Sequence, residues 1–225
     1  MKVIVVGQNA GVITPLIKKA GFIVVEKKPD FVISYGGDGT LMVAEYLYPG
    51  IPKIILKGSL ICKKASPLPN DEVLKRVRAK KYTIEDVWKL EAHANGKTLV
   101  GLNDIVLHNA DMRHAMRYTV AVDGVQVKDS IIGDGVVLAT PFGSTAYYRS
   151  ITDSFFEIGI GLSFNNSTEQ ADHIVLQESR NIVVHISRGP AFVYADNQEE
   201  SLTLNAGDTV TIRKSKQIAK IVKPK

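Results

Sequence analysis

The architecture of this chain is built around Phe31-Val-Ile-Ser-Tyr-Gly-Gly-Asp-Gly-Thr40. The apolar run is typical of a buried strand, and it enters three glycines and one aspartate before a helical pattern begins at Leu41. One interpretation is a tight turn, because glycine tolerates positive φ and aspartate is a common turn and N-cap residue. The other is a loop whose backbone lies close to a ligand, with the Asp38 carboxylate directed at it. The stretch alone leaves both interpretations open.

Short apolar runs alternate with helical segments through the first third of the chain. Their β-branched residues continue along the whole run, which is typical of parallel strands covered by helices on both faces. We expect strands at 2–6, 22–25, 31–35 and 53–56, and helices at 14–20, 41–48 and 70–80, the last of them capped by Asn70. In such a sheet ligands bind beyond the carboxyl ends of the strands, which is where residues 36–39 lie.

From about residue 81 the pattern changes to short strands joined by turns. Asn95-Gly96 and Asp123-Gly124 each separate two strand-like runs and predict hairpins. The predicted fold class is an α/β N-terminal domain with a parallel sheet, residues 1–80, plus a β-rich C-terminal domain, residues 81–225, and is α+β overall. The last strand could pack back on the first domain. We expect strands in the second domain at 82–94, 98–108, 117–122, 125–128, 182–186, 192–195, 201–204, 209–213 and 218–222.

The composition is that of an ordinary globular protein, with 225 residues of which 45% are hydrophobic and 23% charged. A net charge of +5 suits an anionic partner such as a nucleotide, although a modest positive charge more often serves solubility. The basic residues are spread along the chain without an Arg-rich arm, so no nucleic-acid partner is expected. The histidines show no metal-ligand spacing and are interpreted as structural or surface residues: His93, His108, His114, His173 and His185.

Cys62 is the only cysteine, which excludes an internal disulfide and favours a reducing compartment. The apolar start at residues 3–6 stops at Gly7 and is too short for a signal peptide. No run approaches the roughly 20 apolar residues that a membrane span needs. We therefore expect a cytoplasmic protein with no membrane partner.

Phosphate is the ligand that the glycine loop would suit. Successive backbone N–H groups between a strand and a helix N-terminus form an anion-binding concavity, and the helix dipole adds to it. Asp38 would repel phosphate unless it has another task, such as taking the proton of an attacking hydroxyl, as a carboxylate does in kinases. The predicted phosphate or nucleotide loop comprises Gly36, Gly37, Gly39 and Thr40.

Two polar neighbours, Asn103 and Asp104, stand within a strand-like run that disfavours both residue types. Asparagine can form two hydrogen bonds with an adenine edge, and a carboxylate can accept hydrogen bonds from ribose hydroxyls. The alternative is a bulge or the end of a strand.

A longer polar stretch, Thr140-Pro-Phe-Gly-Ser-Thr-Ala-Tyr147, follows a strand expected at 136–139. Ser144 or Thr145 would be a natural helix cap, which is the structural interpretation. The functional interpretation is a second loop whose hydroxyl and N–H groups face a nucleotide.

Together, these residues resemble the NAD kinase family. The motifs that carry the resemblance stand in order as the glycine loop 36–40, Asn103-Asp104, and Asp134-Gly135 followed by the polar run 140–147. The tail Val193-Tyr-Ala-Asp-Asn-Gln198 looks like the last strands of that family. Gly-Gly-Asp-Gly alone is a weak motif, because diacylglycerol and sphingoid lipid kinases share it, whereas the run at 140–147 is specific.

The resemblance implies an NAD kinase, which transfers a phosphoryl group from ATP or a related phosphate such as polyphosphate, with Mg²⁺, to the adenosine ribose 2′-hydroxyl of NAD. Asp38 matches the acid that activates this hydroxyl, and NAD would lie in the crevice between the two domains. Asp134 and Ser150 would act partly across a subunit boundary, which implies a homodimer or homotetramer. The implied NAD contacts are Asn103 and Asp104 at adenine and ribose, Thr145, Ala146 and Tyr147 along the adenylate half, and Asp134 and Ser150 at the rest of NAD.

The sequence also departs from the family pattern. Residues 57–64 replace a Gly-rich segment that ends in Leu-Gly-Phe-Leu, and Phe142 stands where a small hydroxyl residue is usual. Asp104 stands where glutamate is more common, Ser150-Ile-Thr-Asp153 replaces a Ser-x-Gly-Gly turn, and Asn197 replaces a glycine. A phenyl ring at position 142 can stack on the nicotinamide ring or close the pocket. Two rival functions therefore stay open: a kinase of this fold acting on another hydroxyl, such as a lipid, and a non-catalytic NAD(P)-binding protein.

Overall fold

The computed structural model describes residues 1–168 and 172–225, which form two compact units. The N-terminal unit comprises Met1–Val87 together with Gln217–Lys225, and the C-terminal unit comprises Trp88–Lys216. Two long strands, β5 (Tyr82–Ala94) and β16 (Thr209–Pro224), contribute residues to both units. The end of the chain therefore folds with its beginning.

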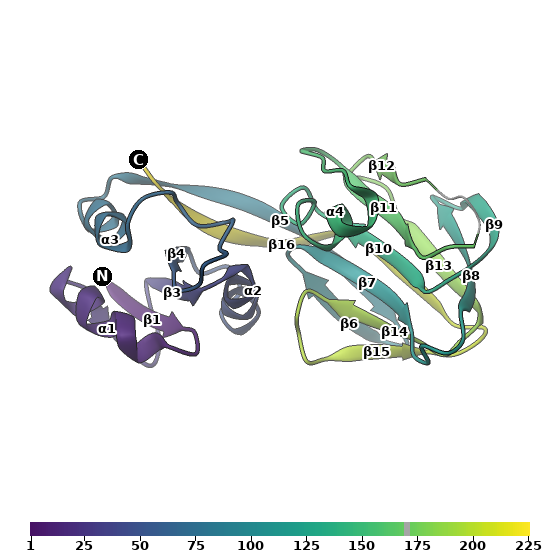
Figure 1. Cartoon of the computed structure of the whole chain (residues 1–225), viewed down its shortest axis with the longest axis horizontal. Helices are drawn as coiled ribbons and strands as arrows, with labels where there is room; N and C mark the ends of the chain where they lie inside the picture. Colours follow the sequence, from purple (N-terminus) through teal and green to yellow (C-terminus); the bar gives the residue numbers. More distant parts are fainter. Residues whose placement is uncertain (169–171) are drawn as a thin grey trace. The chain divides into compact units, whose positions relative to one another are not determined.

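A parallel sheet forms the centre of the N-terminal unit (Figure 1). Its strand order is β2-β1-β3-β4-β16, and each neighbouring pair runs parallel. Parallel strands need crossover connections, and helices supply them after β1 and after β3. The expected parallel sheet is confirmed. Its elements are β1 (Lys2–Val6), α1 (Ala10–Lys19), β2 (Ile23–Val24), β3 (Phe31–Gly36), α2 (Asp38–Leu47), β4 (Lys53–Lys57) and α3 (Asn70–Arg78).

Helices cover both faces of this sheet. Ile33 and Leu56 belong to one buried cluster with Ile17 of α1 and Leu74 of α3, so these two helices lie on the same face. Val32 points to the opposite face, because successive side chains of a strand alternate, and α2 packs against β3 and β4 there. Burial on both faces explains why these strands are apolar along their whole length.

A buried ion pair fastens α2 to β4. Glu45 and Lys53 are 3% and 0% exposed, and the Lys53 ammonium donates to the Glu45 carboxylate. The same ammonium donates to the carbonyl oxygens of Tyr48 at 2.5 Å and Ile51 at 2.8 Å, and the N–H of Gly50 donates to Glu45 Oε1 at 3.1 Å. The pair therefore holds the helix whose first residue is Asp38.

Glu45→Ala is expected to lower the free energy of unfolding by about 3–5 kcal/mol, because it leaves the Lys53 ammonium buried without its carboxylate. Urea denaturation would measure this loss. The control is Glu72→Ala, which breaks a partly exposed pair with Arg76 on α3 and should cost less than about 1 kcal/mol. Equal losses in the two variants would contradict a structural role for the buried pair.

A six-stranded antiparallel sheet and the antiparallel part of the ten-stranded sheet form the C-terminal unit. One has the order β12-β11-β10-β7-β14-β15, and the other joins β16, β13, β8 and β9, with β5 and β6 attached where β5 pairs with β16. The elements are β6 (Lys97–Gly101), β7 (Asp104–Asn109), β8 (Met116–Val122), β9 (Val125–Gly133), β10 (Gly135–Ala139), α4 (Tyr147–Thr152), β11 (Ile160–Asn165), β12 (Ile174–Leu176), β13 (Ile182–Arg188), β14 (Ala191–Ala195) and β15 (Ser201–Leu204).

The two sheets share one hydrophobic core. Leu107 and Leu138 come from the first sheet, and Val120, Val184 and Ile212 come from the second, and all of them belong to one buried cluster. The apolar faces therefore pack on each other, as expected of a β-rich domain in which polar residues alternate outward.

The hairpin predictions are confirmed, and two strand predictions are wrong. Asn95-Gly96 and Asp123-Gly124 have positive φ at both positions, as tight hairpin turns require. The single strand expected at 98–108 is divided between β6 and β7, with a break at Leu102 and Asn103. The two strands expected at 209–213 and 218–222 are one continuous strand, β16.

The predicted cap of the third helix is also wrong. The N-cap residue of α3 is Pro69, and Asn70 is already helical. The Asn70 side chain instead accepts from the N–H of Lys57 at 2.8 Å and donates to the carbonyl oxygen of Lys57 at 2.8 Å. The side chain thus forms the two hydrogen bonds that the backbone of a neighbouring strand would otherwise form with Lys57 at the end of β4. The first helix begins at Ala10, before the expected start at residue 14.

Candidate active site

The glycine loop joins β3 to α2, at the carboxyl end of a parallel strand. Gly36 ends β3, Gly37 is the N-cap residue of α2, and Asp38 is the first helical residue. An acid in the first turn is favourable, because the N-terminus of a helix carries partial positive charge. The half-buried Asp38 carboxylate therefore lies where sheets of this type bind ligands.

Packing explains part of the glycine content of this loop. A Cβ atom on Gly36 would lie 2.1 Å from Thr40 Oγ1, and one on Gly37 would lie 3.0 Å from the carbonyl oxygen of Ile61. Gly58 donates its N–H to Gly36 at 3.1 Å, and a Cβ on Gly58 would lie 2.9 Å from the Gly36 nitrogen. Gly36 is therefore required by the close approach of Thr40 in α2, and Gly37 by the segment after β4, whether or not a ligand is bound.

The same segment reaches the Asp38 carboxylate. Asp38 Oδ1 accepts from the N–H of Lys64 at 2.9 Å, and Oδ2 accepts from the N–H of Lys63 at 3.3 Å. Burial raises the pKa of the Cys62 thiol, and the neighbouring Asp38 carboxylate adds to this shift. Residues 57–64, where the sequence departs from the family pattern, therefore hold the orientation of Asp38.

Asn103 and Asp104 lie at the break between β6 and β7. Asn103 Oδ1 is buried and has no hydrogen-bond partner among the residues that the structure describes. Asp104 is 6% exposed and pairs with Ala139 of β10. A buried acceptor without a partner costs free energy, so this position is suited to a ligand that brings a donor.

The pKa of Asp104 is raised to about 7, first by burial and second by the negative charge of Asp196. Both causes disfavour the ionised form. Asp196 accepts hydrogen bonds from the backbone at this break, which is why the run 98–108 cannot continue as one strand.

The polar run after β10 donates hydrogen bonds to the carbonyl oxygens of Leu102 and Asn103, whereas Asp196 accepts from their N–H groups. The N–H of Thr140 donates to the Asn103 carbonyl oxygen at 2.8 Å, and the Thr140 hydroxyl donates to that of Leu102 at 2.7 Å. The N–H of Gly143 donates to Thr140 Oγ1 at 3.0 Å, and a Cβ on Gly143 would lie 2.1 Å from the Asn103 carbonyl oxygen. Only glycine fits against the backbone there.

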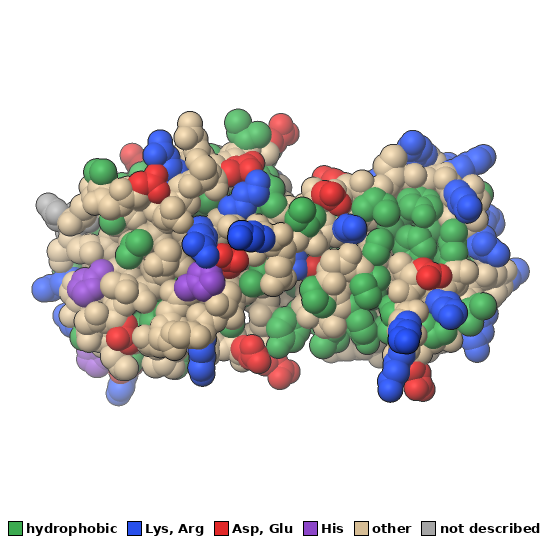
Figure 2. Space-filling view, turned by 180° about the vertical axis from the view of Figure 1, so that it is seen from behind, with side chains coloured by type: hydrophobic (Ala, Val, Ile, Leu, Met, Phe, Trp, Pro, Cys, Tyr) green, Lys and Arg blue, Asp and Glu red, His purple; other side chains and the backbone are tan. Residues whose placement is uncertain are grey.

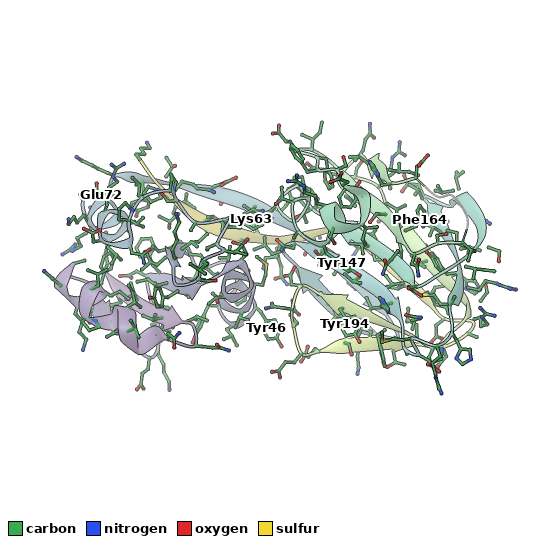
Figure 3. The ribbon with its side chains drawn as sticks, in the orientation of Figure 1. Tyr46, Lys63, Glu72, Tyr147, Phe164 and Tyr194 are labelled. Carbon is green, nitrogen blue, oxygen red and sulfur yellow. The ribbon has the colours of Figure 1, made fainter. Side chains whose placement is uncertain are left out.

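The predicted helix cap in this run is wrong, because the N-cap residue of α4 is Ala146. Ser144 donates instead to the carbonyl oxygens of Pro141 at 2.8 Å and Phe156 at 2.9 Å. Tyr147 opens α4 (Figure 3), and its hydroxyl accepts from Asn165 Nδ2 at 3.2 Å. The Ser150 hydroxyl donates to the Tyr147 carbonyl oxygen at 2.7 Å. Half-buried Thr145 precedes these residues.

Asp134 lies at the opposite end of β10 from Asp104. It directly precedes β10, whose last residue, Ala139, pairs with Asp104. Its carboxylate accepts from Asn166 at 2.9 Å and from Asn109 at 3.4 Å. The structure therefore brings the Asn103–Asp104 pair together with the run 140–143 but not with Asp134 of the same chain.

Asp196 is the residue of this site that the sequence analysis missed. It lies in the stretch 193–198 that resembles the last strands of the family. An Asp-Asn pair between two strand-like runs is also typical of an ordinary turn, so the sequence alone assigns no role to it. Its partners, the backbone N–H groups of residues 102–104, are nearly a hundred residues away in the sequence, so only the fold reveals them.

The charge distribution places few limits on ligands. Lys and Arg side chains are spread among hydrophobic and acidic ones over the face drawn in Figure 2.

Within residues 1–168 and 172–225 no group of three or more His, Cys, Asp or Glu side chains could hold a metal ion. In the same part of the chain none of the helices has the length and apolar character needed to cross a membrane.

Comparison with known proteins identifies the family. The model of the ATP-NAD kinase C-terminal domain matches residues 102–224. The NAD kinase of Carboxydothermus hydrogenoformans is 33% identical over 214 residues, covering 88% of this chain and 76% of that protein. The NAD kinase of Saccharolobus solfataricus is 36% identical over 141 residues, covering 60% of this chain and 53% of that protein.

Two solved structures share the fold over 100% of this chain. A yeast NADH kinase complexed with NADH superposes with a TM-score of 0.87 at 17% identity, over 84% of that chain. An NAD kinase from Archaeoglobus fulgidus in complex with ATP superposes with a TM-score of 0.81 at 24% identity, over 94% of that chain. An α/β unit and a β-rich unit are thus the shared architecture. The chain belongs to the NAD kinase family.

Gly143→Ala is expected to destabilise the protein by more than about 1 kcal/mol and to weaken NAD binding, because its methyl group would displace the Asn103 backbone. Urea denaturation and NAD titration would measure the two effects. Gly11→Ala is the control: its Cβ meets nothing within 4 Å on helix α1, so it should stabilise the protein by about 0.5–1 kcal/mol. Unchanged NAD affinity in a folded Gly143→Ala variant would contradict a role for this contact.

The raised pKa of Asp104 predicts that the protein becomes less stable as the pH rises towards neutral. The folded state holds its proton up to a pKa of about 7, whereas an unfolded Asp loses it at about 3.9. The folded state thus binds more protons between these values, and the free energy of unfolding falls as pH rises through this range. Asp104→Asn should remove this contribution and be more stable than wild type at pH 8. Urea denaturation from pH 4 to 8 tests this, and parallel curves for the two proteins would refute it.

Proposed function

We propose that this chain is an NAD kinase, which transfers a phosphoryl group from ATP to the adenosine ribose 2′-hydroxyl of NAD and so makes NADP. Family membership gives the phosphotransferase class, with an alcohol group as the acceptor. The observation that carries the assignment to this site is the Asn103–Asp104 pair. It presents a buried acceptor that has no partner in the described part of the chain, beside a buried carboxyl group, and such polar groups are costly unless a ligand uses them.

Asp38 is the proposed general base. Each carboxylate oxygen can accept two hydrogen bonds, so the two backbone N–H groups of Lys63 and Lys64 leave capacity for a ligand hydroxyl. These bonds also fix the direction of the carboxylate, which a general base needs in order to reach the proton that it removes. The hydroxyl would pass its proton to Asp38 as its oxygen attacks the transferred phosphorus.

The proposed NAD contacts divide by chemistry. Asn103 would bind the adenine edge through its unpartnered oxygen, and Asp104 would accept from ribose hydroxyls. The exposed start of α4 supports contacts to the adenylate half by Thr145, Ala146 and Tyr147. Asp134 and Ser150 would bind the rest of NAD across a subunit boundary in a homodimer or homotetramer. The separation of Asp134 from Asp104 within one chain is compatible with that arrangement.

The donor is ATP or a related phosphate such as polyphosphate, accompanied by Mg²⁺. Mg²⁺ usually binds one or two carboxylates together with substrate phosphates and water, and it does not need a cage of protein ligands. The residues present fit this mode, because the Asp38 carboxylate lies at a helix N-terminus suited to phosphate. Mg²⁺ would neutralise charge on the phosphates, and Gly36, Gly37, Gly39 and Thr40 would contact them.

Asp38→Asn tests the assignment of the base. It keeps the shape of the side chain but removes the proton acceptor, so kcat for NADP formation should fall by about 10²–10⁴-fold while NAD binding changes little. The measurement is NADP production from NAD, ATP and Mg²⁺ by the full chain, with NAD affinity measured separately. Asp30→Asn, at an exposed carboxylate that accepts from the N–H of Lys2, is the control.

The outcomes separate the rival functions. Wild type that phosphorylates another hydroxyl but not NAD would indicate a different kinase. Wild type that binds NAD and makes no NADP would indicate a binding protein. A near-normal kcat in Asp38→Asn would leave the glycine loop as a turn without a general base.

A further inference from the structure

The Asp196 carboxylate accepts hydrogen bonds from three consecutive backbone N–H groups. It lies in the turn between β14 and β15, and its Oδ2 accepts from Leu102 at 2.7 Å. Its Oδ1 accepts from Asn103 at 2.7 Å and from Asp104 at 3.2 Å. These bonds replace the ladder bonds that a continuous strand would have made, so the carboxylate fixes the backbone where the NAD contacts begin.

The turn itself is built to bring Asp196 to this place. Asp196 has a φ of 50°, a left-handed conformation that is uncommon outside glycine. Its N–H donates to the Asp104 carbonyl oxygen at 3.1 Å, which continues the pairing of β14 with β7. A Cβ on Gly101 would lie 2.4 Å from that same oxygen, so glycine is required for the approach. The left-handed conformation of Asp196 and the absence of a side chain at Gly101 both allow the Asp196 N–H to reach the Asp104 carbonyl oxygen.

Two carboxyl groups thus share a buried region, with Lys89 of β5 facing Asp196. Burial is the main cause that raises the pKa of Asp196, while the hydrogen bonds from three N–H groups and the charge of Lys89 act to lower it. Asp104 has burial and the charge of Asp196 as the causes of its raised pKa. Asp196 is therefore the better place for the negative charge, and Asp104 is the better place for a proton.

We propose that Asp196 is a positioning residue for NAD recognition: it fixes the backbone of the Asn103–Asp104 pair and keeps Asp104 protonated in the free protein, so that Asp104 loses this proton when it accepts the ligand hydroxyls. The inference rests on the proposed function, because it assumes that the ligand is NAD. The Asp104 O–H bond breaks, the proton passes to the solvent, and the carboxylate accepts hydrogen bonds from NAD without forming a covalent bond. No other reactant takes part.

Two measurable consequences follow from this linkage. NAD binding releases a proton when the solution pH is near or below the pKa of Asp104, which is about 7. NAD affinity also rises with pH, and it falls about tenfold for each pH unit well below that value, because ligand binding is linked to the loss of one proton.

The test is calorimetry of NAD binding to the full chain at pH 6.5, in two buffers with different heats of ionisation. The difference in apparent heat counts the protons released. Wild type should release most of one proton, and Asp104→Asn should release none. Asp196→Asn should bind NAD about 10–100-fold more weakly at pH 8, since the contacts are misplaced. It should also release fewer protons, because without the neighbouring charge a larger fraction of Asp104 is ionised before NAD binds.

Asp123→Asn is the matched control. Asp123 also has a left-handed backbone, with φ of 48°, and its carboxylate also accepts a backbone N–H, that of Asn181 at 2.9 Å. It lies in the turn between β8 and β9 and should match wild type in affinity and proton count. Thermal unfolding would establish that each variant is folded. If Asp196→Asn does not fold, Asp196→Glu takes its place: it keeps the charge but moves the carboxylate, so affinity should fall while proton release persists.

The failures are distinguishable. Wild type that neither binds NAD nor makes NADP overturns the proposed function. Wild type that binds NAD without releasing a proton overturns the present inference and leaves the function standing. Asp196→Asn with weaker binding but the wild-type proton count would show that Asp196 supports the fold only. Unchanged binding and proton count in that variant would remove any role for Asp196.

Discussion

The structure depends on how the backbone at Asn103 is held. The Asp196 carboxylate accepts the N–H group of Asn103. The N–H of Thr140 donates to the Asn103 carbonyl oxygen, and Gly143 packs so closely against that oxygen that no side chain would fit. Three strands of one sheet, β14, β7 and β10, thereby end at one place, and the polar atoms of the Asn103–Asp104 pair are left to the interior. Each partner satisfies a backbone group that the strand ladder cannot reach, so the site costs little in lost hydrogen bonds apart from the atoms that await a ligand.

The N-terminal unit also uses backbone N–H groups at the end of a strand, but there they hold the proposed general base. The segment after β4 lies against the glycine loop and donates backbone N–H groups to Asp38. The loop, the helix that follows it and the buried Glu45–Lys53 pair form one rigid support for a single carboxylate. A general base works only when its direction is fixed, and both units use hydrogen bonds from backbone N–H groups to hold a functional carboxylate or the backbone beside it.

The buried acids show a conflict between stability and function. An ionised Asp104 is unfavourable in the folded protein, because it is buried and faces another carboxylate. An uncharged residue there would be more stable above neutral pH, yet it could not accept hydrogen bonds from two hydroxyls as a carboxylate does. Groups of this kind persist where the ligand supplies the compensation that the protein lacks.

The sequence by itself determined the parallel sheet, the hairpins at Asn95 and Asp123, and the glycine loop with its acid, because hydrophobic period and turn chemistry are local. It misplaced the cap at Asn70 and divided or joined strands wrongly, because those features depend on partners distant in the chain. Only the tertiary structure decided that Asp196 holds Asn103 and Asp104, since the three N–H groups reach it across more than ninety positions of sequence. Local pattern sets the elements, whereas the pairing of buried polar groups is settled only when distant strands meet.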